Sequence, residues 1–131
     1  MSAARLLLDT QALLYLVSGE KVPEKVNRLV QAPDTETYLS SASLWEIAIK
    51  TSRGSALSLD ISIEELHRMC MSGGMKTLDL RVAHFSTLRK LPWHHKDPFD
   101  RLLIAQAKAE GLTLVGSDAA FRKYDVRSIW E

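Results

Sequence analysis

The sequence predicts one α/β domain in which helices flank a central, mostly parallel sheet. Short apolar runs alternate with helical patterns along the whole chain, an order typical of parallel α/β layers. A length of 131 residues fits one domain, residues 1–131, and 46% apolar residues are enough to fill a single core. We find no repeat, linker or low-complexity tract that would divide the chain.

The first part of the chain predicts two strands and three helices. Leu6–Leu8 is an apolar run that stops at Asp9, after which apolar residues recur at helical spacing. A second helix is expected from near Pro23, and residues 37–40 have the β-branched and aromatic character of a strand. Residues 42–50 are apolar nearly all round, which predicts a helix buried on more than one side.

The middle of the chain predicts a loop and then a capped helix. Residues 57–61 are expected to form a loop or a short extended piece. Ser62 and Glu65 then have the spacing of a capping box, and the glycine pair at 73–74 ends the helix that follows. A strand is expected over 76–80.

The last part contains the clearest helix, because Asp97 is a good N-cap and Pro98 is favoured at the first helical position. Gly111 ends this helix. A polar loop over residues 91–96 precedes it. The remaining expected elements are a helix over 82–88, a strand over 112–116, a short helix over 118–124 and a strand over 126–129.

Composition excludes several classes of protein. The formal net charge of +1 and the charged fraction of 25% give no bulk electrostatic signal for nucleic acid or membrane. No window approaches the roughly 18 apolar residues of a membrane span, and Asp9 interrupts the early apolar run that a signal peptide would need. The single cysteine, Cys70, reads as a small core filler. We therefore expect a soluble, cytoplasmic protein.

Acidic residues follow the predicted strands, where the ligand crevice of an open parallel sheet lies. Asp9 follows the first strand, Glu46 lies on the helix after the second, Asp100 opens the helix before the fourth, and Asp118 comes just after the fourth. Asp100 also shares the core-facing stripe of its helix. All four carboxylates could converge on one edge of the sheet.

Each acid has a structural explanation that competes with a functional one. Asp9 could equally cap the helix after it, and Asp118 taken alone reads as a cap. Asp100 gains from the helix dipole whatever else it does. Glu46 could pair with Lys50, but its apolar neighbours leave it little polar face, which favours a functional reading.

Carboxylates that are forced together repel one another unless a cation neutralises them. Oxygen ligands alone suit a hard ion, and a site that keeps several waters suits Mg²⁺, with Mn²⁺ as its substitute. Such an ion acidifies water and stabilises charge on a phosphodiester oxygen. The pattern therefore predicts a hard divalent cation, Mg²⁺ or Mn²⁺, at these acids.

Four segments resemble motifs of PIN-domain ribonucleases of the VapC type, and they cover nearly the whole chain in order. They are LLLDTQALLYLV, SASLWEIAIK, HHKDPFDRLLIAQA and LTLVGSDAAF. The resemblance implies a Rossmann-like fold, magnesium-dependent endonuclease activity on RNA, inhibition by a small antitoxin protein, and a homodimer. These toxins belong to type II toxin–antitoxin pairs.

The resemblance also implies a set of site residues. It assigns metal binding and catalysis to Asp9, Glu46, Asp100 and Asp118, the four acids selected above on physical grounds. It matches Thr10 and Ser117 to positions whose hydroxyls help to orient water or carboxylates, and Asp97 could also contribute to the site. The sequence departs from the motifs in two places, at Gln11, where His or Asn is more usual, and at Gly116, where a larger residue is usual.

Other polar and aromatic residues are weaker candidates. His94 and His95 invite a metal or general-base role, but we expect an exposed loop near the substrate path. Trp93 and Trp45 could stack on bases, although Trp45 is expected in the core. Basic residues that could hold phosphates are Lys50, Arg53, Lys96, Arg101, Arg122 and Lys123.

The sequence thus predicts that the four acids bind one or two Mg²⁺ ions and that RNA is hydrolysed to 5′-phosphate and 3′-hydroxyl ends. The rival hypotheses are a non-catalytic scaffold that binds RNA or antitoxin and, less well supported, a receiver-like domain that accepts a phosphoryl group on aspartate. Metal binding without cleavage would select the scaffold, and labelling by a small phosphodonor would select the receiver.

Overall fold

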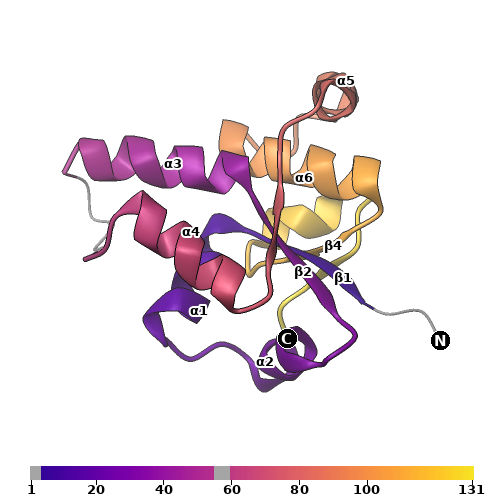
Figure 1. Cartoon of the computed structure of the whole chain (residues 1–131). Coiled ribbons are helices and arrows are strands. Elements are labelled where there is room, and N and C mark those ends of the chain that lie inside the picture. The colour runs from indigo at the N-terminus through magenta and orange to yellow at the C-terminus, as the bar shows by residue number, and fades with distance from the viewer. Residues whose placement is uncertain (1–3, 55–59) are drawn as a thin grey trace.

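The protein forms one parallel sheet between two layers of helices (Figure 1), as a computed structural model of residues 4–54 and 60–131 shows. Within these residues the strands are hydrogen-bonded in the order β3-β2-β1-β4-β5, and every neighbouring pair is parallel. The strands are β1 (Arg5–Leu8), β2 (Glu36–Ser40), β3 (Lys76–Leu78), β4 (Thr113–Val115) and β5 (Ser128–Ile129). The predicted α/β class with a central parallel sheet is therefore confirmed.

The helices lie in the predicted order between the strands. They are α1 (Thr10–Ser18), α2 (Glu24–Gln31), α3 (Ser41–Ser52), α4 (Ile63–Ser72), α5 (Val82–Lys90), α6 (Pro98–Glu110) and the 3₁₀ helix η1 (Ala119–Lys123). The predicted N-caps are confirmed: the side chain of Ser62 accepts from the backbone N–H of Glu65, and that of Asp97 accepts from Phe99 and Asp100. The capping box at Ser62 is only half formed, because the carboxylate of Glu65 pairs with Arg68. Gly111 ends α6 in a left-handed conformation, which favours glycine.

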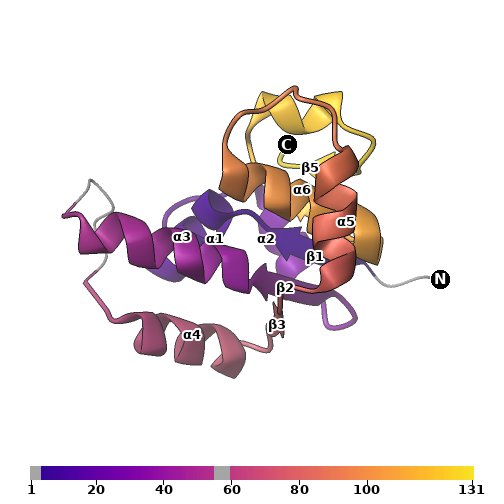
Figure 2. The ribbon, with the colours of Figure 1, turned by 90° about the horizontal axis from the view of Figure 1, so that it is seen from above.

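Successive residues of β1 point to opposite faces of the sheet and so enter two separate cores. Leu7 packs with α6, η1 and the end of α5 on one face, whereas Leu6 and Leu8 pack with α1, α2, α3 and α4 on the other. Figure 2 shows α6 and α4 on opposite sides of the strands. The continuous apolar run of β1 is thus explained by a central strand that is buried on both faces.

The strand order reverses direction at β1, and this reversal locates the site. The chain runs from β1 through β2 to β3 on one side and then returns to place β4 and β5 on the other. A crevice forms where the connections diverge, outside the carboxyl ends of β1 and β4. The register pairs Leu8 with Val115, so Asp9 and Gly116 follow side by side.

Several predicted elements differ in extent or type from those observed. The strand expected over 76–80 ends at Leu78, because its partner β2 ends opposite it at Ser40. The strand expected over 126–129 pairs only at Ser128 and Ile129, and the short helix after Asp118 is 3₁₀. Part of the predicted loop at 57–61 lies outside the described residues.

The helix α3 is less buried than its composition predicts. Ala42, Ser43, Glu46 and Ile47 are buried, but Ala48 is exposed and Trp45 has 54% of its surface exposed. The expectation that Trp45 lies in the core is therefore wrong. The ring of Phe99 in α6 meets Trp45 edge-on, with 4.9 Å between ring centres, and covers only part of it. The expectation that α3 is buried on more than one side is confirmed, because Ala42 belongs to the core around Leu7 and Ile47 to the core around Leu6 and Leu8.

A buried polar chain joins β2 to α6 and α5. The hydroxyl of Ser40 donates to Oε1 of Gln106, and Nε2 of Gln106 lies 3.3 Å from Nδ1 of His84. The other ring nitrogen of His84 lies 2.8 Å from the carboxylate of Glu110. Ser40, Gln106 and His84 are fully buried, and their mutual hydrogen bonds offset the cost of removing them from water.

Among the helices of the described residues, none combines the length and the apolar content that crossing a bilayer requires.

Candidate acidic site

A cavity of about 290 Å³ opens at the carboxyl ends of β1 and β4. All four predicted acids line it, so the expected convergence of residues far apart in the sequence is found in the structure. The lining residues are Asp9, Thr10, Gln11, Leu14, Glu46, Lys50, Asp97, Asp100 and Asp118. They come from α1, α3, the start of α6 and the turn after β4.

Asp9 lines the cavity and is also the cap of α1, the structural role that the sequence allowed. It caps α1, with Oδ1 accepting from the backbone N–H of Ala12 at 2.7 Å, and it is 95% buried. Burial, together with the charges of Asp100, Glu46 and Asp118, raises the pKa of Asp9 from 3.8 to about 7, against the lowering effect of the Ala12 hydrogen bond. Capping therefore orients a carboxylate whose charged form is unfavourable without a cation.

Glu46 lines the cavity and also makes the predicted pair with Lys50. One carboxylate oxygen, Oε2, accepts from the Nζ atom of Lys50 at 2.6 Å, which is the predicted pair one turn along α3. The other oxygen, Oε1, is buried and has no hydrogen-bond partner in the structure. A buried carboxylate oxygen without a donor is unfavourable, so this atom is available for a ligand.

Asp100 and Asp97 lie together at the start of α6. Asp97 is the N-cap, and its Oδ1 accepts from Phe99 at 2.9 Å and from Asp100 at 3.0 Å. Asp100 is half-buried at the cavity, as its place on the core-facing stripe predicts. Burial, the charge of Asp97 and the charges of Glu46 and Asp118 raise the pKa of Asp100 to about 6, although His95 opposes this shift.

Asp118 is the most exposed of the four acids, with 39% of its side chain exposed. It caps η1, with Oδ1 accepting from Ala120 at 2.9 Å, as predicted. Its other oxygen, Oδ2, lies 2.9 Å from Nε2 of His95. Partial burial tends to raise its pKa, but the hydrogen bonds from Ala120 and His95 outweigh this effect and lower it.

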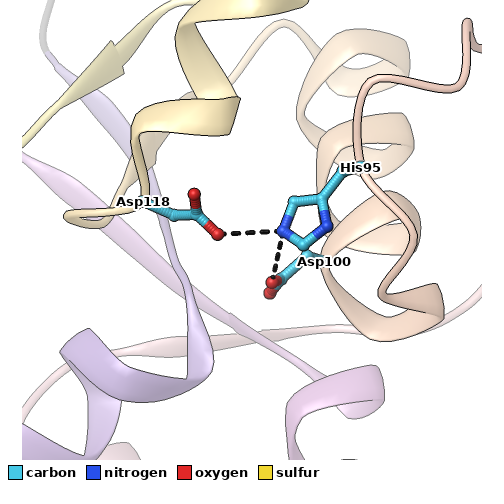
Figure 3. A group of neighbouring side chains, drawn as sticks. All are labelled: His95, Asp100 and Asp118. Atoms are coloured by element: carbon cyan, nitrogen blue, oxygen red, sulfur yellow. Dashed lines mark hydrogen bonds and ion pairs between the residues drawn. The ribbon is translucent and has the colours of Figure 1, made fainter.

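His95 belongs to the site, and the sequence did not predict this. Figure 3 shows its ring between the carboxylates of Asp118 and Asp100, and Nε2 lies 3.0 Å from Oδ2 of Asp100. The ring is mostly buried, with 17% of the side chain exposed. The expectation of an exposed side chain is therefore wrong for His95, whereas it is confirmed for His94. Adjacent histidines in a loop have no periodicity that could tell which one turns inward.

The two predicted hydroxyl residues have different surroundings. Thr10 is buried beside the cavity, and its Oγ1 donates to the hydroxyl of Ser43 at 3.0 Å. Ser117 is exposed and is not among the residues that line the cavity. The structure therefore brings Thr10 to the site but leaves the predicted assistance by Ser117 without a contact to support it.

The two departures from the motifs are accommodated locally. Gln11 lines the cavity from α1, and its side-chain amide donates to the hydroxyl of Tyr15 at 2.9 Å. Gly116 lies against Asp9, where there is no room for a side chain. Neither residue displaces an acid from the cavity.

One predicted phosphate contact is wrong. Arg101 is buried, and its guanidinium donates to the carbonyls of Pro92 and Leu91 and lies 3.7 Å from the ring centre of Trp93. It therefore holds the loop before α6 and does not face solvent. Lys50 is bound to Glu46 at the cavity, so it balances acidic charge there.

The residues fit a hard divalent cation. The cavity gathers carboxylates from four segments, two of which have a pKa raised by burial and mutual repulsion, and Glu46 adds a buried oxygen without a donor. A cation would relieve each of these unfavourable features at once. Fold and site together define an α/β domain with an acidic cavity at the topological switch point of its sheet.

Comparison with known proteins identifies this class. The PIN domain family matches residues 6–127, and the chain belongs to that family. The recognition made from the four sequence motifs is thereby confirmed. No curated protein matches the chain significantly.

Solved structures share the fold at low sequence identity. A chain of VapBC2 from Rickettsia felis, bound to a fragment of promoter DNA, has a TM-score of 0.74 at 18% identity over 97% of this chain and 99% of its own. A chain of VapBC-1 from nontypeable Haemophilus influenzae has a TM-score of 0.66 at 17% identity over 95% of this chain and 96% of its own. A chain of FitAcB from Neisseria gonorrhoeae has a TM-score of 0.57 at 20% identity over 95% and 96%.

Proposed function

We propose that this protein is a magnesium-dependent endoribonuclease and the toxin of a toxin–antitoxin pair. The observation that carries the proposal is the convergence of Asp9, Glu46, Asp100 and Asp118 on one cavity of a PIN domain, with a buried oxygen of Glu46 left without a donor. Mn²⁺ is expected to substitute for Mg²⁺, because both prefer oxygen ligands.

The four acids would hold the ion, and each residue around them has a defined task. Asp9 and Asp118 are oriented by the backbone N–H groups that they cap, while Lys50 balances the charge of Glu46. A bound ion lowers the pKa of water and stabilises charge on a phosphodiester oxygen. Asp9 must lose its proton to bind the ion, so binding favours a pH near or above 7. RNA hydrolysis would leave 5′-phosphate and 3′-hydroxyl ends.

The proposed partners follow from the neighbouring structures. Two of them are VapBC structures that cover 97% and 95% of this chain, so we expect a small antitoxin protein to bind and inhibit this one. A homodimer that acts in the cytoplasm, where its RNA substrates are, is also expected. The partly exposed apolar residues Leu14, Tyr15 and Leu16 of α1 offer surface for either contact.

RNA cleavage by the purified protein tests the proposal. We expect cleavage with Mg²⁺, none with EDTA, and none by Asp9→Asn or Asp100→Asn, whose circular dichroism should stay that of the wild type. Asp34→Asn, an exposed acid outside the cavity, is the matched control and should cleave normally. Sequencing of 5′ ends after brief expression in cells would identify the RNA that is cut.

Two results would count against the proposal. A folded wild-type protein that binds Mg²⁺ and cuts no RNA would select the non-catalytic scaffold. If Asp100→Asn is as toxic to cells as the wild type, the toxicity does not depend on the acidic cavity.

A further inference from the structure

We propose that His95 is a positioning residue that holds Asp118 against Asp100 by donating its Nε2–H, and that it is not a metal ligand. The inference rests on the proposed function, because it concerns how the acidic cavity is kept ready for a cation. His95, Asp100 and Asp118 have the composition of a metal site with nitrogen and oxygen ligands. Whether His95 binds the ion or only positions Asp118 decides which metals the site prefers.

The hydrogen bond at the other ring nitrogen decides the tautomer. The backbone N–H of Asp97 donates to Nδ1 of His95 at 3.1 Å, so Nδ1 carries a lone pair and no proton. The proton of the neutral ring is then on Nε2, which points at Oδ2 of Asp118 and Oδ2 of Asp100. A nitrogen that carries a proton has no lone pair for a metal, so Nε2 acts as a donor.

The loop around His95 is held in place by hydrogen bonds to α6 and to the residue after η1. The hydroxyl of Tyr124 accepts from the backbone N–H groups of His94 at 3.1 Å and His95 at 2.9 Å. Arg101 donates to the carbonyl of Pro92 at 2.8 Å and to the same Tyr124 hydroxyl at 3.3 Å. The imidazole is therefore presented to the acids by a fixed backbone and not by a freely moving loop.

Asp118 is the acid that needs such support. It lies in the turn between β4 and η1, and more of its side chain is exposed than that of Asp100 or Glu46. Ala120 holds Oδ1 and His95 holds Oδ2, which together fix the plane of the carboxylate. Each oxygen keeps a second lone pair, so these donors orient Asp118 without blocking a cation. Groups that orient metal ligands in this way commonly contribute about 10–100-fold in metal affinity.

Three substitutions distinguish hydrogen-bond donation by His95 from metal binding by His95. In His95→Gln, the amide nitrogen can reach the position of Nε2 and can still donate, whereas His95→Asn and His95→Ala place no donor there. His94→Ala is the matched control on the same loop, since the side chain of His94 is exposed. Mg²⁺ and Mn²⁺ affinities are measured on each full-length protein by calorimetry, together with the melting temperature.

We expect His95→Ala and His95→Asn to lose about 10–100-fold in Mg²⁺ affinity, whereas His95→Gln stays within about threefold of the wild type. The ratio of Mn²⁺ to Mg²⁺ affinity should not change in any variant, because no metal–nitrogen bond is lost. A larger loss for Mn²⁺ than for Mg²⁺, or a failure of Gln to rescue, would overturn the proposal. Equal affinity of His95→Ala and the wild type would overturn it as well.

The ¹⁵N chemical shifts of the imidazole provide a second readout that needs no enzyme activity. We expect Nε2 to carry the proton and Nδ1 to be unprotonated, both before and after Mg²⁺ is added. A proton on Nδ1 would contradict the inference. If the wild type binds Mg²⁺ but cuts no RNA, the proposed function fails, while these shifts and affinities still test His95.

Discussion

A Cβ atom on Gly116 would lie 2.2 Å from Oδ2 of Asp9 and 2.6 Å from its Cγ. The register of β1 and β4 places these two residues side by side, since Leu8 pairs with Val115. The backbone of Gly116 is not left-handed, so glycine is needed here for space and not for conformation. The departure from the usual motif at Gly116 thus makes room for the most deeply buried aspartate of the cavity.

We expect Gly116→Ala to displace Asp9 and to weaken Mg²⁺ binding. The added methyl group also meets Phe121 at 2.8 Å, so overpacking should cost about 1–3 kcal/mol of stability. Gly73→Ala is the matched control, because its Cβ would meet its nearest atoms at an ordinary 3.5 Å. Calorimetry with Mg²⁺ and denaturant unfolding test both effects, and unchanged Mg²⁺ affinity in Gly116→Ala would contradict the first.

Stability without metal should fall as pH rises from about 4 to about 7. The pKa of Asp9 is about 7 in the folded protein and 3.8 in the reference state, so the folded state holds a proton that the unfolded state releases in this range. The loss from Asp9 is at most about 4 kcal/mol, at about 1.36 kcal/mol per pKa unit. Asp100, with a pKa of about 6, should add to it.

Urea unfolding in EDTA at pH 5 and pH 8 measures this difference. Asp9→Asn cannot ionise and should lose most of the pH dependence, while Mg²⁺ at pH 8 should restore the stability of the wild type. A wild-type protein that is more stable at pH 8 than at pH 5 in EDTA would show that the cavity does not hold Asp9 protonated.

Lys50→Met should destabilise the protein without metal and increase its stabilisation by Mg²⁺. The substitution removes the ammonium group that donates to Oε2 of buried Glu46 at 2.6 Å. Because Oε1 has no hydrogen-bond partner either, neither carboxylate oxygen then keeps a donor. Because 44% of the lysine side chain is exposed and water can partly replace it, we expect a loss of about 1–2 kcal/mol. Thermal unfolding with and without Mg²⁺ measures both effects, and Lys25→Met, an exposed lysine on α2, should show neither.

His84→Ala should destabilise the fold without changing the acidic cavity. The change leaves Gln106 without one partner and empties the space of a fully buried ring, which should cost about 2–4 kcal/mol. Mg²⁺ affinity should stay within about twofold of the wild type, because His84 does not line the cavity. Phe85→Ala, at an exposed neighbouring position, should change neither, and a normal denaturation midpoint for His84→Ala would refute the role of the polar chain.

The sequence by itself determined the fold class, most of the elements and the four acids of the cavity. Apolar runs, the capping residues Ser62 and Asp97 and the stop at Gly111 act within one turn of chain, so they can be read locally. Asp9 and Asp118 could be selected because parallel strands place their carboxyl ends at one edge.

Only the tertiary structure decided contacts between segments that no local pattern links. The turn of His95 toward Asp118, the closeness of Gly116 to Asp9, the burial of Arg101 and the exposure of Trp45 all depend on what packs opposite each residue. Periodicity tells which side chains lie on the same face of a helix or strand. The neighbour that meets this face is set by strand register and helix packing, and these emerge only when the whole chain is folded.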